Sequence, residues 1–128
     1  KGCLIKPGVN IKFPWELELA DCVWIGENVW IDNLAKVKIG NHVCISQGAL
    51  ILTGMHDIKS DSFDTFVMPI EIGNQVWIGA NANIAPGVSI CDGVVISMGS
   101  AVLKSIQIPG VYQGNPARQI MGQNEFRW

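Results

Sequence analysis

The sequence predicts an all-β fold in which short parallel strands wind into a β-helix, a solenoid of stacked coils. Two observations lead to this prediction: aliphatic residues return at every sixth position, and small residues follow many of them. A period of six fits neither a 3.6-residue helix nor alternating strands joined by hairpins. It fits a short strand and a tight corner, repeated three times per coil, with each aliphatic side chain inside a narrow prism.

The repeat is most regular in the second half of the chain. Its aliphatic positions there are Ile72, Ile78, Ile84, Ile90, Ile96, Val102 and Ile108. Small residues often come next, as Gly73 and Gly79 do, and these let the backbone bend at a corner. We therefore expect all of these aliphatic side chains to point into the prism and to stack on their equivalents one coil away.

The N-terminal half keeps the same step but twice changes phase by two residues. Its regular groups are Ile5, Ile11 and Leu17, then Leu19, Ile25, Ile31 and Val37, then Ile39, Ile45 and Ile51. Segments twenty residues apart resemble one another, as L-E-L-A-D-C-V-W-I and V-K-I-G-N-H-V-C-I do. Because neighbouring coils satisfy each other's backbone groups, such a fold grows by stacking repeats.

The composition indicates one folded domain of 128 residues, 48% hydrophobic and 16% charged. A net charge of −2 and the absence of a Lys/Arg run argue against nucleic-acid binding and against a polybasic membrane patch. No apolar run approaches the ~18 residues that span a bilayer, so we expect no membrane insertion and a cytoplasmic location. The chain begins Lys1-Gly2-Cys3 rather than with methionine, so we allow for an N-terminal segment ahead of it.

The four cysteines are scattered and form no C-x-x-C pair. They are Cys3, Cys22, Cys44 and Cys91. We expect them to be reduced and partly buried, as small hydrophobic residues of a cytosolic protein, rather than part of a disulfide or metal framework.

The regular spacing fails between Ile51 and Ile72, whose separation is not a multiple of six. The intervening segment, about residues 54–69, is polar and is flanked by Gly54 and Pro69, as expected for a loop that leaves the prism. Long loops within compact domains are often functional. This loop carries His56.

His56 is suited to general-base chemistry because an imidazole titrates near working pH. A carboxylate or a backbone carbonyl on its other ring nitrogen would fix the tautomer. The neighbouring Asp57 cannot be assumed to orient the ring; it would brace the loop or bind a substrate. The alternative for His56 is a routine loop histidine, and the fold together with the excursion favours catalysis.

From Pro109 onward the repeat gives way to P-G-V-Y-Q-G-N-P-A-R-Q-I-M-G-Q-N-E-F-R-W, with turn residues first and polar and aromatic residues after them. We expect a short C-terminal cap over about residues 109–128 that closes the open end of the coil. Near residues 116–124 this cap would be a short helix or an extended segment.

Three blocks carry a resemblance to a known family. They are N-V-W-I-D-N-L-A-K-V-K-I-G-N-H-V-C-I-S-Q-G-A-L-I-L-T-G-M-H-D, P-I-E-I-G-N-Q-V-W-I-G-A-N-A-N-I-A-P-G-V-S-I and Q-G-N-P-A-R. These resemble the hexapeptide-repeat O-acetyltransferases of the colanic-acid biosynthesis type, relatives of the galactoside and maltose acetyltransferases. The resemblance implies a left-handed parallel β-helix and transfer from acetyl-CoA, without a metal, to a sugar hydroxyl in surface polysaccharide biosynthesis. It also implies a homotrimer with active sites between subunits, and His56 of the T-G-x-H motif as the base.

The same resemblance implies where the cofactor binds. Trp77 matches a tryptophan of the active-site wall, and Ala80 and Met98 match positions whose backbone amides face the pantetheine arm of CoA. Lys104 and Arg118 match basic residues near the CoA phosphates. Structural alternatives stay open: Trp77 would be an aromatic at a trimer seam, and the two basic residues would be solvated charges.

For the acceptor, the resemblance implies Asn28, and Asp32 lies on a coil near that region. Both would equally serve as corner residues, since Asn and Asp tolerate turn geometry. Met55 stands where relatives usually have a small or polar residue, so the resemblance does not fix the choice of acceptor.

His42 lies inside a regular repeat, and we expect it at the surface or at a subunit contact. Cys44 follows two residues later, but a Cys-His nucleophile is disfavoured because direct transfer from acetyl-CoA requires no covalent acyl-enzyme. Trp24, Trp30 and Trp77 lie off the core positions and suggest a partner surface, for which a three-sided prism makes a threefold trimer natural.

The sequence gives less support to other functions that a β-helix can have. A carbonic anhydrase on this fold needs three histidine ligands for zinc, and the chain has two histidines. An ice-binding face would need ranks of threonine, and only Thr53 and Thr65 occur. A xenobiotic (chloramphenicol-type) or serine acetyltransferase and a non-catalytic scaffold stay open as alternatives.

Overall fold

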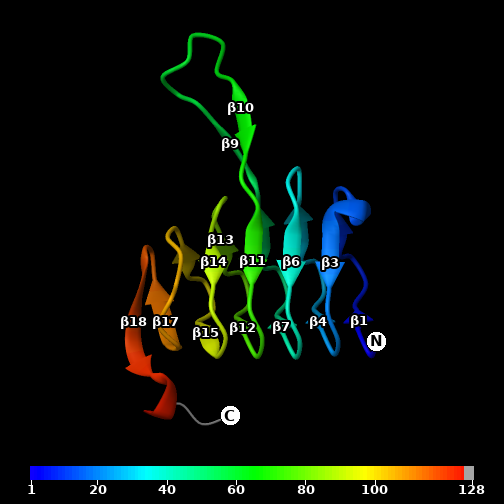
Figure 1. Ribbon diagram of the computed structural model, residues 1–128, viewed down its shortest axis with the longest axis vertical. Coiled ribbons are helices and arrows are strands. Elements are labelled where there is room, and N and C mark those ends of the chain that lie inside the picture. Colours follow the sequence, from blue (N-terminus) through cyan, green and yellow to red (C-terminus); the bar gives the residue numbers. More distant parts are fainter. Residues whose placement is uncertain (126–128) are drawn as a thin grey trace.

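The computed structural model describes residues 1–125 and shows a three-sided solenoid whose successive strands go to three parallel sheets in turn (Figure 1). We name these sheets faces A, B and C, in the order in which the chain visits them. Face A contains β1 Leu4–Ile5, β4 Trp24–Ile25, β7 Cys44–Ile45, β12 Trp77–Ile78, β15 Val94–Ile96, β17 Gly110–Gly114 and β18 Ala117–Gly122. Face B contains β2 Asn10–Ile11, β5 Trp30–Asp32, β8 Leu50–Leu52, β13 Asn83–Ile84 and β16 Ala101–Val102. Face C contains β3 Leu17–Leu19, β6 Val37–Ile39, β11 Ile70–Ile72 and β14 Ser89–Ile90.

Ranks of isoleucine and valine fill the interior, with one rank behind each face. On face A the parallel register places Ile25, Ile45, Ile78 and Ile96 one above the other, and all four are buried. Burial of one such side chain is worth about 1.5–3 kcal/mol, so the stack supports a rigid coil. The predicted fold class, an all-β parallel β-helix of hexapeptide repeats with an extruded loop and a cap, is confirmed.

The two phase changes of the N-terminal half arise at the corner from which the chain enters face C. Its strands β3, β6 and β11 are three residues long, and β6 and β11 bury both their first and their last residue. Val37 and Ile39, two residues apart, therefore both point inward. In the later coil Val88 and Ile90 likewise both point inward, but residues 85–87 alone separate Val88 from Ile84, whereas residues 32–36 separate Val37 from Ile31; the later coil is therefore two residues shorter at this corner.

The prediction that Ile108 points into the prism is wrong. Its side chain is 62% exposed, whereas Ile106, which is 7% exposed, pairs with Ile90 in a parallel bridge and continues the rank of face C. The carbonyl of Ile108 instead accepts a hydrogen bond from the Tyr112 hydroxyl at 2.7 Å. The chain leaves the coil two residues early because it turns here into the cap.

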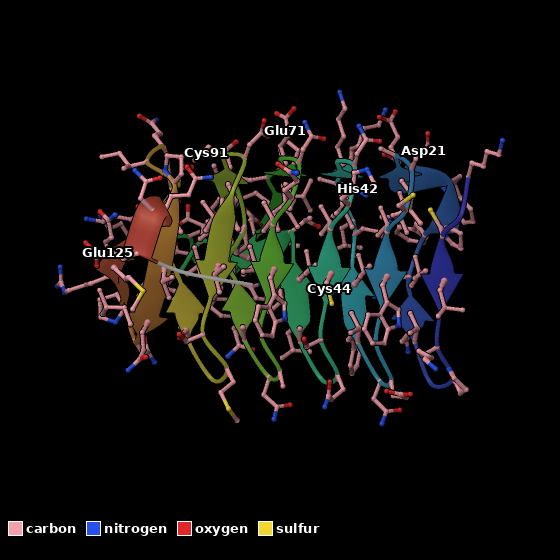
Figure 2. The ribbon with its side chains drawn as sticks, turned by 90° about the horizontal axis from the view of Figure 1, so that it is seen from below. Asp21, His42, Cys44, Glu71, Cys91 and Glu125 are labelled. Carbon is pink, nitrogen blue, oxygen red and sulfur yellow. The ribbon has the colours of Figure 1, made fainter. Side chains whose placement is uncertain are left out.

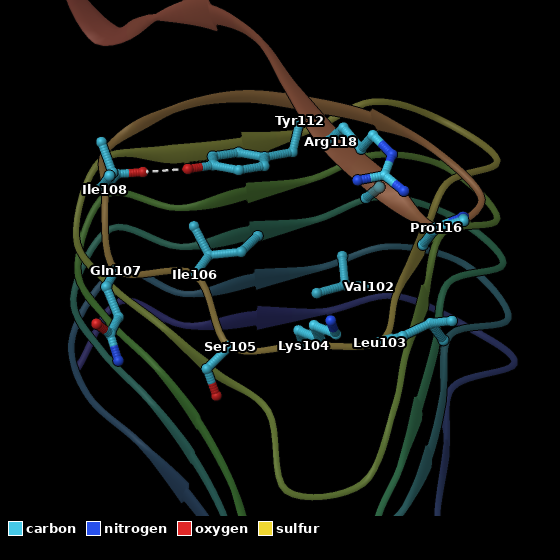
Figure 3. A pocket seen from close by; sticks show the side chains of 11 residues that line it. Val102, Leu103, Lys104, Ser105, Ile106, Gln107, Ile108, Tyr112, Pro116 and Arg118 are labelled. Atoms are coloured by element: carbon cyan, nitrogen blue, oxygen red, sulfur yellow. Dashed lines mark hydrogen bonds between the residues drawn. The ribbon is translucent and has the colours of Figure 1, made fainter.

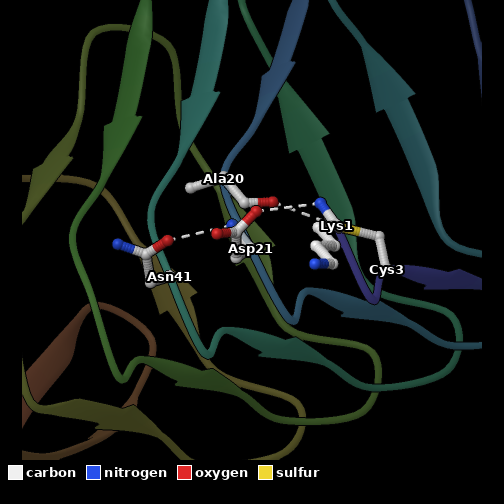
Figure 4. Close-up of polar contacts among 5 residues, drawn as sticks. All are labelled: Lys1, Cys3, Ala20, Asp21 and Asn41. Carbon is white, nitrogen blue, oxygen red and sulfur yellow. Dashed lines mark hydrogen bonds and ion pairs between the residues drawn. The ribbon is translucent and has the colours of Figure 1, made fainter.

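Side-chain oxygens of Asn and Asp connect the coils at the corner between faces C and A. Asn41 accepts from the amide of Asp21 at 2.9 Å, Asn74 from that of Asn41 at 2.7 Å, and Asp92 from that of Asn74 at 2.7 Å. Figure 4 shows the first of these contacts, beside the pair that Asp21 makes with the amino group of Lys1. This ladder gives the corner the same repeat as the core.

All four cysteines are free, but only two are partly buried as predicted. Cys44 and Cys91 are half-buried, and burial raises the pKa of both thiols. Cys3 and Cys22 are exposed, which corrects the prediction for these two. Cys22 lies at a corner with φ 59°, where its side chain is directed away from the core.

The predicted loop is a β-hairpin that projects from the solenoid at the corner between faces B and C (Figure 1). Its strands, β9 Gly54–His56 and β10 Thr65–Val67, pair antiparallel. The cap is a second antiparallel pair, β17 with β18, which extends face A. Near residues 116–124 the extended alternative is observed in β18, and a 3-10 turn over Gln123–Glu125 follows it; residues 126–128 of the predicted cap lie outside the described part.

The helical segments within residues 1–125 are two 3-10 turns, η1 Pro14–Glu16 and η2 Gln123–Glu125. Over that same range, no helix has the length and apolar character needed to cross a membrane.

Candidate active site

The hairpin is fixed to the coil below it through Thr53, which is fully buried. The Thr53 hydroxyl donates to the carbonyl of Asp32 at 2.9 Å and accepts from the amide of Ala35 at 3.0 Å. Its backbone also takes part: the amide donates to the same Asp32 carbonyl, and the carbonyl accepts from Met68. Thr53 therefore fixes both the start of β9 and the end of β10 to the coil.

His56 is the last residue of β9 and pairs with Thr65 across the hairpin. Its side chain is exposed, yet three contacts hold the ring. Nδ1 lies 3.3 Å from the carbonyl oxygen of Phe63 and 3.2 Å from the hydroxyl of Thr65. The ring of Phe63 stacks on the imidazole, with centroids 4.5 Å apart and planes 7° from parallel.

The contact with Phe63 favours one tautomer, whereas the Thr65 hydroxyl can donate to or accept from Nδ1 and so fits either. A carbonyl oxygen only accepts, so the contact with Phe63 is a hydrogen bond only when Nδ1 of His56 carries the proton. In the neutral ring, Nε2 then carries the lone pair and can accept a proton. This is the arrangement anticipated from the sequence, with a backbone carbonyl rather than a carboxylate on the second nitrogen.

Asp57 braces the hairpin tip, which is the first of the two roles that the sequence analysis gave it. Its carboxylate accepts from the amide of Lys59 at 2.9 Å, and its own amide donates to the carbonyl of Asp64 at 2.8 Å. The carboxylate of Asp64 in turn accepts from Ser62 at 2.6 Å and from Ser60 at 3.0 Å. Those hydroxyls, Ser62 first, hold the pKa of Asp64 below its usual value.

Three of the predicted cofactor residues line one cavity of about 540 Å³ on face A and its corner with face B. Trp77 forms part of the wall, half-buried, with its indole N–H donating to the Ser46 hydroxyl at 2.9 Å. Ala80 lies at the corner, and Met98, 73% exposed, lies one coil above it. The neighbouring Gly79 is required there, since a β-carbon would come 2.5 Å from the Met98 amide nitrogen.

The other two cofactor residues, Lys104 and Arg118, line a separate cavity of about 490 Å³ at the C-terminal end of the solenoid (Figure 3). Both side chains are exposed, and the floor is apolar, with Val102 and Ile106. The cap hairpin lies between the two cavities, because Gln113 of β17 lines the first and its paired residue Arg118 of β18 lines the second.

The two predicted acceptor residues lie at opposite ends of β5. Asn28 is an exposed corner residue with φ 60°, which fits the second of its predicted roles, that of a corner residue. Asp32 lies at the end near the hairpin root, where its backbone carbonyl holds Thr53. Its Oδ1 is buried 3.8 Å from the ammonium of Lys12 and accepts no hydrogen bond from any residue in the range 1–125.

His56 does not line the cavity of Trp77, Ala80 and Met98 within one chain. The hairpin projects from the corner between faces B and C, whereas that cavity lies at the corner between faces A and B. The width of face B separates the predicted base from the predicted cofactor residues.

His42 is an exposed corner residue with φ 56°, as expected. Figure 2 shows it along the edge of the solenoid with Asp21 and Cys91, while Cys44 lies away from that edge. Burial raises the pKa of Cys44, which disfavours the thiolate that a nucleophile needs. Among residues 1–125, no cluster of three or more His, Cys, Asp or Glu side chains is arranged to hold a metal ion.

The sequence reasoning did not find Phe63 or the role of Thr53. Thr53 carried a signal, since it is a lone threonine at a position where the regular strand ends. Phe63 carried none, because neither its left-handed backbone nor its stacking on His56 follows from a pattern.

Comparisons with known proteins agree with this fold. Residues 69–104 match the family described as bacterial transferase hexapeptide (six repeats). The chain is 41% identical over 117 residues to a protein of Escherichia coli (strain K12) whose name assigns it to colanic acid biosynthesis as the acetyltransferase WcaF. That alignment covers 91% of this chain and 64% of WcaF, so the chain spans less than two thirds of the length of this relative.

Two solved structures are also similar. A galactoside acetyltransferase in complex with coenzyme A superposes with a TM-score of 0.89 at 29% identity, covering 97% of this chain and 64% of that one. A hexapeptide-repeat acetyltransferase of Vibrio cholerae O1 biovar eltor, complexed with acetyl coenzyme A, has a TM-score of 0.85 at 27% identity and coverages of 95% and 71%.

The chain is therefore a hexapeptide-repeat protein with a parallel β-helix fold. Within that class it resembles the colanic-acid-type and galactoside O-acetyltransferases, as its sequence motifs predicted.

Proposed function

We propose that the protein is an acetyl-CoA-dependent O-acetyltransferase that transfers the acetyl group directly to a sugar hydroxyl, with His56 as the general base. The observation that carries this proposal is the held imidazole: Nδ1 is tied to the Phe63 carbonyl, so Nε2 is the nitrogen that can accept a proton. The relatives named for acetyl transfer, and the neighbours that hold coenzyme A or acetyl coenzyme A, supply the reaction class.

In the proposed reaction, Nε2 of His56 takes the proton of the acceptor hydroxyl as its oxygen attacks the thioester carbonyl. The tetrahedral intermediate collapses, the C–S bond breaks, and the proton passes from His56 to the departing CoA thiolate. The Phe63 carbonyl supports the transient imidazolium, because a hydrogen bond to a charged donor is stronger than one to a neutral donor. Positioning of both substrates supplies much of the rate.

The cavity of Trp77, Ala80 and Met98 suits the pantetheine arm, since its lining residues are largely apolar. Lys104 and Arg118 lie beyond the cap hairpin and would bind the phosphates of the same CoA molecule. Exposed lysine and arginine side chains can move toward a phosphate at small cost, and arginine can bind one through two N–H groups.

A homotrimer would bring together what a single chain keeps apart. Around a threefold axis, the hairpin of one subunit can reach the cavity of its neighbour, so that each active site lies between two subunits. The exposed side chains of Trp24, Trp30 and Val67 of the hairpin support this assembly, because large apolar side chains on a surface favour partner contacts. Asp32, at the hairpin root, is the better placed of the two predicted acceptor residues, because its Oδ1 has the ion pair with Lys12 but no hydrogen bond within residues 1–125.

The proposed class of acceptor and the proposed biosynthetic process are taken from the names of the relatives. We propose a sugar hydroxyl in surface polysaccharide biosynthesis because WcaF carries colanic acid biosynthesis in its name. The cytoplasmic location stays a prediction from the sequence.

The test is release of free CoA thiol from acetyl-CoA, screened across sugars, aminoglycosides, chloramphenicol and serine. We expect turnover with a sugar and a loss of about 10²–10⁴-fold in kcat/KM for His56→Ala, the typical contribution of a general base. His42→Ala, which removes the other histidine at an exposed corner, should keep its activity.

Two outcomes would contradict this. Turnover only with chloramphenicol or serine would replace the sugar by those acceptors. No turnover together with no binding of acetyl-CoA would identify a non-catalytic scaffold instead.

A further inference from the structure

Phe63 contacts His56 through both its backbone and its side chain. Its backbone carbonyl oxygen lies 3.3 Å from Nδ1, and its phenyl ring stacks on the imidazole with centroids 4.5 Å apart and a tilt of 7°. The carbonyl can accept a hydrogen bond from a proton held on Nδ1, an arrangement in which the Thr65 hydroxyl accepts as well, and the phenyl ring lies parallel to the imidazole plane. A single residue therefore restricts both properties that decide where the Nε2 lone pair points.

The conformation of Phe63 is unusual for its type. Its φ is 52°, in the left-handed region that bulky side chains rarely adopt and that turns normally assign to Gly or Asn. The side chain is 54% exposed and is not part of the hydrophobic core. The ring therefore gains no core packing in return for the unfavourable backbone, and its contact with His56 is the interaction that explains a phenylalanine here.

The hairpin tip fixes this conformation from both sides. Before it, the amide of Phe63 donates to the carbonyl of Ser60 at 3.1 Å. After it, Asp64 is held by the Ser60 and Ser62 hydroxyls and by the amide of Asp57. The direction of the Phe63 carbonyl is thus determined by the turn, whereas the position of the ring depends on the side chain alone.

We propose that Phe63 is a positioning residue for His56: its carbonyl fixes the Nδ1-protonated tautomer and its ring fixes the imidazole plane. This inference rests on the proposed role of His56 as the base. Without the phenyl ring, the exposed imidazole would be held by its two Nδ1 contacts alone. Its plane would be less restricted, and Nε2 would less often face the acceptor hydroxyl. The effect should therefore fall on kcat rather than on binding of acetyl-CoA.

The two contacts can be separated by substitution. Phe63→Gly keeps the left-handed turn and the carbonyl but removes the ring, and Phe63→Asn does the same if the glycine variant is unstable. Phe63→Tyr retains a stacking ring and is the rescue variant. Phe66→Leu is the matched control, because Phe66 is an aromatic of the same hairpin that pairs with Met55 rather than with His56.

The first readout is NMR of the 128-residue protein labelled in its histidines. In the wild type we expect the nitrogen shifts of an Nδ1-protonated ring and His56 ring protons displaced by the ring current of Phe63. Phe63→Gly should lose the ring-current displacement, while Phe63→Tyr and Phe66→Leu keep it. Wild-type His56 signals in Phe63→Gly, or in Phe63→Asn, would overturn the proposal.

The second readout is turnover with the best acceptor. We expect Phe63→Gly to lower kcat about tenfold with KM for acetyl-CoA within about twofold of the wild type, and Phe63→Tyr to recover most of kcat. An unchanged kcat would also overturn the proposal. The NMR comparison needs no turnover, so it decides about Phe63 separately from whether the proposed acetyl transfer is correct.

Discussion

Thr53 links the hairpin to the coil beneath it through one buried hydroxyl that both donates and accepts. Thr53→Val keeps the shape of the side chain but leaves the Ala35 amide without its acceptor. Loss of a partner for a buried polar group costs about 1–3 kcal/mol, so we expect the free energy of unfolding to fall by that amount, together with a drop in kcat. Urea unfolding and steady-state kinetics measure both. Thr53→Ser, which keeps the hydroxyl, is the control; the interpretation is wrong if serine is the more damaging of the two.

Individual residues of the candidate site differ in whether the sequence predicts them. His56 follows from the break in a six-residue rhythm, because a regular solenoid has no structural reason to extrude a histidine. Phe63 does not follow, since its conformation depends on hydrogen bonds of the folded tip. Asn28 shows the opposite case: its type suits an acceptor site and a corner equally, and only the backbone angle identifies the corner.

At the scale of the element, the hairpin tip depends on one ionised carboxylate. The hydroxyls of Ser62 and Ser60 lower the pKa of Asp64 from its ordinary value of 3.8. A carboxyl whose pKa is lower in the folded than in the unfolded state adds stability above the unfolded value and loses it as pH falls through the folded value. The tip should therefore stay ordered above about pH 4 and loosen as the pH falls further.

A titration of backbone amide shifts from pH 5 to pH 2 checks this behaviour. We expect the amides of residues 60–64 to move toward unfolded positions below pH 4, while those of buried coil residues such as Ile45 stay in place. Asp64→Asn should show the loosened tip at every pH. Tip amides that do not respond to pH in the wild type would contradict the role given to Asp64.

Strands were predicted correctly where the six-residue repeat determines them. The prediction failed where two neighbouring aliphatic residues fit the inward position equally well. The aliphatic ranks gave strands on three faces because every coil imposes the same register on the next. Ile106 and Ile108 are both aliphatic, and the choice between them depends on the Tyr112 hydroxyl and on the antiparallel pairing of β17 with β18. Those contacts come from the cap, where the repeat no longer applies.

At the scale of the whole molecule, the proposed base and the proposed cofactor cavity lie at different corners of one prism, so a site shared between subunits makes a specific prediction about mixed assemblies. His56→Ala should remove the base and Ala80→Trp should fill the cavity, and each variant alone should form an inactive trimer. In trimers formed by co-expression at equal amounts, about one quarter of the interfaces would combine an intact hairpin with an intact cavity. We therefore expect activity near one quarter of the wild type, measured by thiol release on mixed trimers whose mass is confirmed by light scattering. If each site were contained within one subunit, the mixture would be as inactive as its two components.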